Sequence, residues 1–454
     1  MKKIAKLSLV AAVAVAGFTS ANAQSFEEAI KGVEVTGSVV YRYNDSNNDT
    51  DAGSYSKAVK NSSGTVTGYD DISKVSDSTN NYKVALGLAA KVNEDVKFNS
   101  RFIVGAPSNT GTGDAGFASL NSSENGDQNV GTELTNAYFA YTGLKNTTVN
   151  VGKQGLTTPW TVAVDSDGNE QTGTGILALS TVGPVTLAAA YFNQTNLANS
   201  LDSKLGGFTE KTFAGEDYLV DATAVKGAVL DGSEDIATVG AIAVAGPVTV
   251  DAWYLDAQDK FDSYTVGAKS SLELSGIKLG ADARYASLSL DKNVAVALKS
   301  VTSANGTAEE DNSMAKLALT GKAGIFDAKI AYAMTGKEGG LTALDNDATT
   351  TLLGWSITSN GKADADYWQV VAGVDILSNL NLSANYGNIQ YIANADSDID
   401  VEEEEIYAQL LYKMSKNLNT YVRYGTYTKE ASDNSNSVDI NDDVRGRLQV
   451  EYTF

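Results

Sequence analysis

Cysteine and histidine are both absent from the 454-residue chain. Without cysteine, no disulfide framework and no thiol chemistry can form. Without histidine, the chain lacks the usual general base at neutral pH and the commonest metal ligand, which excludes hydrolytic sites built around that residue. Proline is scarce, at four residues, so extended segments can run without interruption. No constellation for catalysis remains, and we do not expect an enzyme.

Basic residues are also few. Lysine and arginine total 34 against 56 aspartates and glutamates, which gives a formal net charge of -22. A chain this acidic should repel nucleic acid and favour cations. The excess also keeps exposed loops soluble, which is the simpler explanation for any single carboxylate.

The N-terminal residues 1–23 have the composition of a cleaved export signal. Lysines come first, an apolar run follows over 7–18, and an Ala-Asn-Ala pattern at 21–23 provides the small-x-small cleavage site. Twelve apolar residues are too few for a membrane helix, which needs roughly 20. We therefore expect export, with 24–454 forming a single mature domain.

The last ten residues, 445–454, alternate between apolar and polar side chains. A strand has a side-chain period of two, so one face of this segment can meet lipid and the other water. Tyr452 and Phe454 end the apolar face. A terminal strand of this kind is typical of bacterial outer-membrane barrels, where it serves as the signal for the barrel-assembly machinery.

The same alternation recurs along the whole mature chain and predicts about eighteen strands. Each run is long enough to cross a bilayer, because about 10 residues at roughly 3.3 Å, tilted near 45°, rise about 23 Å. We expect the strands to begin near residues 33, 81, 96, 133, 147, 174, 184, 236, 247, 263, 276, 313, 325, 366, 379, 404, 417 and 443.

The connections follow a rhythm in which a short turn comes after every second strand. The intervening links are mostly long and polar, as at 44–80, 106–132, 194–235 and 336–365. One rim of short periplasmic turns and one of long extracellular loops is the plan of an all-β, transmembrane antiparallel β-barrel. The link at 258–262 breaks this rhythm. A soluble sandwich or solenoid would also alternate, but it would not explain tyrosine and valine on the apolar face of strand after strand.

All six arginines of the chain fall in predicted strands and, by parity, point away from lipid. We expect five of them to share one region of the inner wall near the seam where the barrel closes. Barrels of 16 to 18 strands leave an aqueous channel, which such a basic wall would line. The six are Arg42, Arg101, Arg284, Arg423, Arg445 and Arg447.

The link at about 154–175 is the third long one on the outer side. In general porins, which this plan resembles, the third outer loop folds into the barrel and narrows it. Here it carries Asp165, Asp167 and Glu170 and no basic residue between 155 and 175. Opposite the arginine wall, these acids would set up a transverse field that favours cations. They could also be ordinary surface carboxylates, and DSDGNE at 165–170 partly matches a calcium-binding loop.

Two motifs resemble a known family. FEEAIKGVEVTGSVVYRY at 26–43 and GKQGLTTPW at 152–160, together with the YTF ending, are similar to the Campylobacter-type major outer membrane porin of epsilon-class bacteria. The resemblance implies an 18-stranded homotrimeric porin that prefers cations and passes small hydrophilic solutes. It also implies that 152–160 leads into the constriction loop.

The leading hypothesis is an outer-membrane porin for passive diffusion, embedded among outer-membrane lipids and without an organic cofactor. Calcium at the constriction is the one cofactor that the sequence suggests. Two alternatives stay open. One is a substrate-specific channel, for which Tyr421, Tyr427 and Trp253 give a sparse aromatic track, and the other is a surface adhesin whose pore is incidental.

Overall fold

A computed structural model describes most of the barrel and parts of the long loops. The predicted signal segment, 1–23, lies outside the described residues. Among the described residues, no helix combines the length and apolar character that crossing a bilayer requires. The described residues are 32–48, 57–60, 66–70, 75–105, 116–119, 131–197, 207–213, 216–222, 230–301, 309–392, 400–432 and 437–454.

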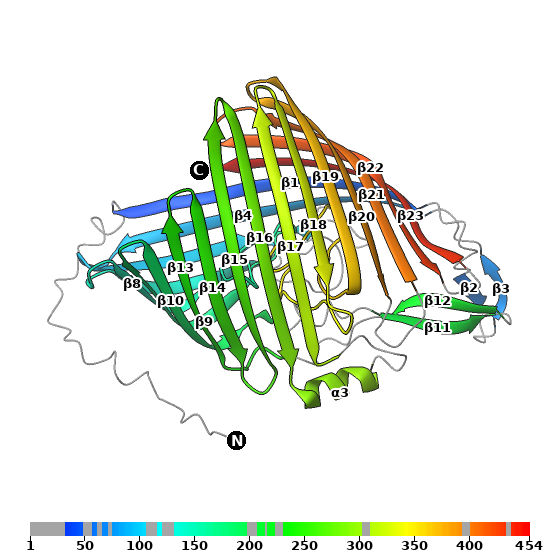
Figure 1. The fold of residues 1–454 in the computed structure, drawn as a ribbon, viewed down its shortest axis with the longest axis horizontal. Helices are drawn as coiled ribbons and strands as arrows, with labels where there is room; N and C mark the ends of the chain where they lie inside the picture. The colour runs from blue at the N-terminus through cyan, green and yellow to red at the C-terminus, as the bar shows by residue number, and fades with distance from the viewer. Residues whose placement is uncertain are drawn as a thin grey trace.

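Eighteen long strands form one closed antiparallel barrel, which confirms the predicted fold and strand number (Figure 1). The strands are β1 (Val33–Asn48), β4 (Val75–Lys91), β5 (Val96–Val104), β7 (Thr132–Tyr141), β8 (Thr147–Gly155), β9 (Thr172–Val182), β10 (Val185–Thr195), β13 (Ile236–Ala245), β14 (Val248–Ala257), β15 (Phe261–Leu274), β16 (Ile277–Leu290), β17 (Asp311–Ala323), β18 (Phe326–Thr335), β19 (Ala363–Leu377), β20 (Leu380–Ile392), β21 (Asp400–Lys413), β22 (Leu418–Ser432) and β23 (Ser437–Thr453).

A short strand, two hairpins and one helix lie on the loop side of the barrel, in the links between the long strands. The two-residue strand β6 (Ala118–Ser119) pairs with β4. Two hairpins, β2 (Lys57–Lys60) with β3 (Val66–Asp70) and β11 (Gly207–Phe213) with β12 (Glu216–Ala222), form separate two-stranded sheets. The helix α3 (Lys292–Val301) lies in the link between β16 and β17.

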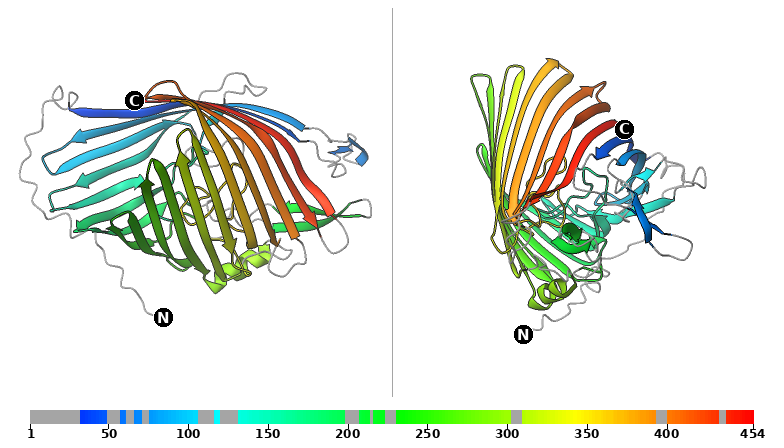
Figure 2. Two further views of the ribbon diagram at one scale, coloured as in Figure 1. Left: turned by 45° about the horizontal axis from the view of Figure 1, so that its top comes forward. Right: turned by 90° about the vertical axis from the view of Figure 1, so that its right-hand side faces the viewer.

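The barrel closes where the first strand pairs with the last, because β1 pairs with β23 on one side and with β4 on the other. Figure 2 shows the red β23 beside the blue β1. Gly37 and Phe454 exchange two backbone hydrogen bonds, of 2.9 and 3.0 Å, at the end of this seam. The rings of Tyr452 and Phe454 stack at 5.8 Å and are exposed on the outer surface. Every strand in the wall thus has a partner on both sides, which satisfies the backbone groups in lipid.

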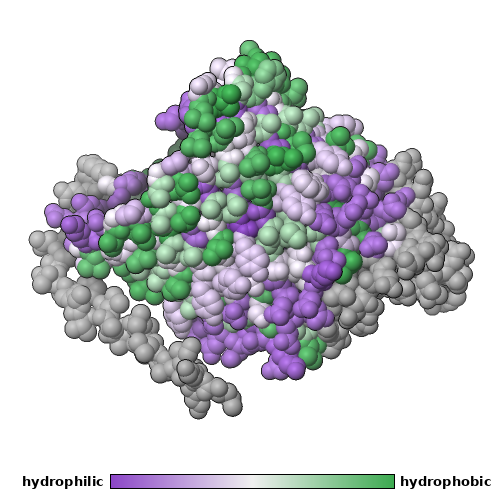
Figure 3. Space-filling view, viewed as in Figure 1, coloured by the Kyte–Doolittle hydropathy of each residue, from purple (hydrophilic) through white to green (hydrophobic). Residues whose placement is uncertain are grey.

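The outer face is apolar, as period-two alternation requires. Large exposed side chains occur on strand after strand, for example Val39, Leu187, Val266, Leu317 and Ile406. In Figure 3 the hydrophobic residues spread over the barrel wall, while hydrophilic residues gather toward the loop-side rim. This band is the surface that can face the hydrocarbon of a membrane.

Some strands extend further than the alternation indicated. β4 begins at 75 rather than near 81, and β23 at 437 rather than near 443. At the start of β4 the added residues include the polar run SDSTN, so the sequence has no apolar alternation there to mark the strand. The irregular link at 258–262 is a tight turn on the loop side, where Asp259 has a φ of 60° and the Lys260 N–H donates to the Ala257 carbonyl.

Candidate functional site

Two long loops fold back into the barrel. The first spans 156–171, slightly shorter than the predicted 154–175, and the second spans 336–362. At the root of the first, the fully buried indole of Trp160 donates from Nε1 to Ser263 Oγ of β15 at 2.7 Å. Apolar residues of both loops pack with inward-facing strand residues in one core that contains Leu156, Trp160, Leu341 and Leu344. The loops are therefore part of the folded interior.

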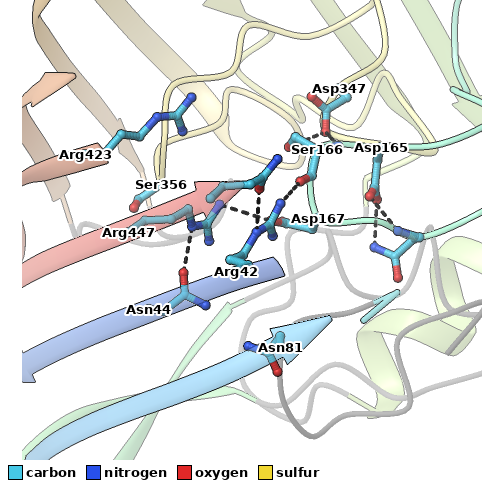
Figure 4. A network of polar contacts seen from close by, with 12 residues as sticks. Arg42, Asn44, Asn81, Asp165, Ser166, Asp167, Asp347, Ser356, Arg423 and Arg447 are labelled. Carbon is cyan, nitrogen blue, oxygen red and sulfur yellow. Dashed lines mark hydrogen bonds and ion pairs between the residues drawn. The ribbon is translucent and has the colours of Figure 1, made fainter. Parts of the chain in front are cut away.

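The tip of the 156–171 loop contacts the closing seam through Arg42 of β1 (Figure 4). The buried Arg42 guanidinium donates to the Ser166 carbonyl at 2.5 Å and lies 3.4 Å from Asp167. Its Nε donates to Gln449 Oε1 at 2.9 Å. Arg447 of β23 also approaches Asp167, at 3.7 Å. Asp167 thus lies between two arginines of neighbouring strands.

Glu170 closes the loop against the next part of the wall. Its carboxylate accepts hydrogen bonds from Arg101 of β5, at 3.1 Å from Nε and 2.9 Å from Nη2. Lys83 of β4 lies 2.9 Å from the same carboxylate, and it donates to the Gly168 carbonyl at 2.6 Å. Burial raises the pKa of Glu170, but the hydrogen bond from Arg101 and the charge of Lys83 together hold it below its usual range. Glu170 is therefore an ionised anchor in direct contact with the basic wall.

The 336–362 loop is anchored to the opposite end of the arginine wall. Glu405 of β21 accepts backbone N–H bonds from Trp355 at 2.9 Å and Ser356 at 2.7 Å. Arg445 of β23 donates to Ser356 Oγ at 2.6 Å. The strand predicted to begin near residue 404 begins at Asp400, so residues 402–405 lie in β21 and alternate between the two faces of the wall.

The two loops also bind each other. The Leu344 N–H donates to the Trp160 carbonyl at 2.9 Å, and Gln171 donates to Asp345 at 3.0 Å. Ser166 donates to Asp347 Oδ2 from both its N–H, at 3.0 Å, and its hydroxyl, at 2.9 Å. The barrel interior therefore holds a two-loop unit.

Three carboxylates meet at the contact between the loops. Asp165, Asp345 and Asp347, hereafter the aspartate cluster, each offer an oxygen within 4.8 Å of the others. Asn169 donates to Asp165 from both its N–H and its side chain, at 2.7 Å each. Burial and then the charge of Asp345 raise the pKa of Asp165 from 3.8 to about 7. Hard oxygen ligands at this spacing suit a cation such as Ca²⁺.

The predicted acids therefore divide into two groups. Asp165 joins the aspartate cluster, whereas Asp167 and Glu170 contact cations of the wall. The calcium-loop pattern placed all three in one site, but two of the clustered carboxylates come from the second loop. Their pairing depends on contacts between segments distant in sequence, as with Ser166 and Asp347, which are 181 positions apart.

The six arginines lie in strands and point inward. Arg42, Arg423, Arg445 and Arg447 lie on the adjoining strands β22, β23 and β1, and Arg101 follows on β5. Arg284 is apart from them, on β16. It forms a two-point pair with Asp251 of β14, at 2.9 and 2.8 Å.

Several residues of the site were not identified from the sequence: Lys83, Asp345, Asp347, Trp355 and Glu405. One signal was available. The 336–362 segment contains LTALDN and TLLGWSI. A long outer loop with this many apolar residues is expected to bury them against other parts of the protein. Leu341, Leu344 and Ile357 are indeed fully buried.

Comparisons with known proteins agree with this architecture. The family model described as Campylobacter major outer membrane protein matches residues 1–454. No curated protein matches the chain.

Solved structures with a similar fold include three outer-membrane proteins. Pseudomonas aeruginosa OccK2 (OpdF) is 13% identical, with 93% of this chain and 98% of that chain covered and a TM-score of 0.62. Acinetobacter baumannii OccAB3 is 13% identical, with 93% of this chain and 99% of that chain covered and a TM-score of 0.63. P. aeruginosa OpdL is 17% identical, with 93% of this chain and 99% of that chain covered and a TM-score of 0.60. At these identities the likeness concerns the fold.

Proposed function

Because the chain belongs to the Campylobacter major outer membrane protein family and is an outer-membrane β-barrel porin, we propose that it forms a water-filled, cation-preferring channel for passive diffusion. Its solutes would be small, hydrophilic molecules and ions. The observation that carries the proposal is the charge arrangement inside the barrel. Arginines occupy one wall, and the aspartate cluster lies where the two inner loops meet.

The mechanism combines width and charge. The two inner loops reduce the free cross-section of the barrel, so large solutes would be excluded by size. Asp167 and Glu170 contact basic residues of the wall, which offsets part of its positive charge. The aspartate cluster supplies a local excess of negative charge, and rings or clusters of carboxylates are typical of cation-preferring pores. A polar solute that crosses this region would align with the field between the cluster and the arginine wall.

The proposed function also includes export, insertion into the outer membrane and assembly into an oligomer. Residues 1–23 would direct export and be removed, and the strand that ends at Tyr452 and Phe454 would be read by the barrel-assembly machinery. Closed symmetry is the general preference of homo-oligomers, and a homotrimer is the state we propose. The channel would need neither an organic cofactor nor a catalytic residue.

Planar-bilayer recording of the mature protein tests the proposal. We expect a large, linear conductance and a reversal potential in a KCl gradient that indicates K⁺ preference. The preference should be weaker at high salt, because the charges of the pore are then screened. A linear conductance with no preference, or a preference for Cl⁻, would reject cation selectivity. A closed barrel would favour the adhesin alternative.

A further inference from the structure

Two arginines lie directly opposite each other on neighbouring strands. Arg423 of β22 and Arg447 of β23 are register partners, and both point into the barrel. Like charges in this position destabilise a sheet, because opposed side chains have Cβ atoms only about 5 Å apart. A pair of this kind requires negative charge nearby.

The carboxylates close to this pair are already engaged. Arg447 lies 3.7 Å from Asp167, which Arg42 also contacts at 3.4 Å. Arg445 pairs with Asp443 of its own strand, and its Nε donates to Asp443 Oδ2 at 3.0 Å. Negative charge is therefore shared among the neighbours of Arg423.

Arg423 itself has no carboxylate partner among the described residues. Its Nε donates to the neutral Gln409 Oε1 at 2.5 Å. The two terminal nitrogens, Nη1 and Nη2, find no acceptor in the described part of the chain. In Figure 4 the Arg423 guanidinium projects toward the 336–362 loop. It thus offers a free two-donor edge inside the barrel.

Aromatic rings hold this guanidinium in place. Its Cζ lies 4.8 Å from the ring centroid of Tyr421, 5.7 Å from that of Tyr407 and 5.8 Å from that of Trp355. Trp355 also lies 5.9 Å from Arg447. Cation–π contacts at these distances orient a guanidinium without neutralising its charge. The rings leave its charge available for an anion.

We propose that the pair of Arg423 and Arg447 is a binding subsite for the carboxylate of a small solute in transit. The proposal rests on the channel function and names one solute class for it. Arginine binds a planar carboxylate through two parallel N–H bonds, and the free edge of Arg423 matches that geometry. A singly charged group would reduce the repulsion within the pair. The opposite end of the same solute would face the aspartate cluster, so amino acids and other zwitterions would align across the lumen.

Single-channel recording with a matched pair of solutes tests this proposal. D-galacturonate and D-galactose differ only in the carboxylate, and both would be added at millimolar concentration in low salt. We expect galacturonate to reduce the ion current saturably and galactose to have no comparable effect. Arg423→Gln should weaken the apparent affinity at least tenfold, and Arg423→Lys, which keeps the charge but loses the two-donor edge, should fall between.

Lys97→Gln is the matched control. It also removes one positive charge, but Lys97 lies half-exposed at the start of β5, paired with Glu34 at 3.0 Å. Galacturonate should block this variant as it blocks the native channel. Block by galactose equal to that by galacturonate, or block unchanged in Arg423→Gln, would overturn the subsite. Equal Arg423-dependent block by inorganic phosphate would overturn the carboxylate assignment. These outcomes require an open channel in KCl, so they are distinct from a failure of the channel function itself.

Discussion

The Arg101 guanidinium on β5 and the Glu170 carboxylate at the end of the 156–171 loop form a two-point contact inside the barrel. The Glu170 side chain is almost fully buried, and Lys83 lies 2.9 Å from it. One carboxylate thus compensates two cations. Its removal would leave both of them unpaired in a poorly hydrated position, which is costly.

We therefore predict that Glu170→Gln releases the 156–171 loop from the wall. The cost should be about 3 kcal/mol, in the range found when one partner of a buried ion pair is removed. Urea unfolding of the barrel in detergent measures the stability, and bilayer recording should show a noisier current. Asp167→Asn is the matched control. Asp167 is 57% exposed and its contacts are longer, so its loss should cost less than about 1 kcal/mol. Equal effects of the two substitutions would contradict this anchoring role.

A second prediction concerns pH. Asp165 faces Asp345 and Asp347 across the loop contact, Asp167 on its own loop, and the more distant Lys83 on β4. Its pKa is about 7 in the folded chain, well above 3.8. The folded protein therefore binds this proton more tightly between about pH 4 and pH 7, and the corresponding stability is lost as the pH rises through 7.

Ionisation of Asp165 also adds negative charge to the pore. We expect the reversal potential in a KCl gradient to move toward greater cation preference as the pH rises from 6 to 8. In Asp165→Asn this change should disappear. If the variant kept the full pH dependence, another group would be responsible.

A third prediction concerns calcium. We expect millimolar Ca²⁺ to raise the melting temperature of the purified barrel and a chelator to reverse the effect, because Ca²⁺ takes several oxygen ligands and offsets the repulsion within the aspartate cluster. The effect should be larger at pH 8 than at pH 6, since Ca²⁺ competes with the proton of Asp165. Asp345→Asn should lose it, and Asp95→Asn, in a periplasmic turn, should retain it. A shift that survives in Asp345→Asn would place calcium elsewhere.

The sequence was sufficient for the wall of the barrel because lipid imposes the same rule on every strand. Alternation located all eighteen strands, and parity placed the arginines on the inner face. It failed where that rule ends. Glu402 to Glu405 are four consecutive acids at the outer rim, so the alternation placed the start of this strand near 404, whereas β21 begins at Asp400. In the barrel, Glu403 and Glu405 turn inward while their neighbours turn outward.

The site was harder to predict because its partners are distant in sequence. Local spacing could identify Asp165 as a candidate, but not its position beside Asp345 and Asp347. Local spacing also could not distinguish an acid that forms an ion pair with an arginine from one that lies among other acids. Glu170 and Asp165 are five positions apart in one loop, and their pKa values shift in opposite directions.

The last prediction concerns how the 336–362 loop is held inside the barrel. The Glu405 carboxylate accepts N–H bonds from Trp355 and Ser356. The next residue of the loop, Ile357, is fully buried, and its N–H also donates to Glu405, at 3.4 Å. Glu405→Ala leaves these N–H groups without acceptors, at a cost of about 2 kcal/mol, whereas Glu405→Gln keeps one carbonyl oxygen and should cost less.

Because Trp355 lies beside Arg423, release of the loop tip would also move the indole away from the guanidinium. We therefore expect Glu405→Ala to increase both the conductance and the cleavage of the 336–362 loop by externally added protease, with the barrel itself intact. Glu404→Ala is the matched control, because the Glu404 side chain contacts Tyr386 on the outer surface. If both alanine variants were cleaved to the same extent, the cause would be a general loosening of β21. Cleavage confined to Glu405→Ala would show that one buried carboxylate fixes the second loop in the pore.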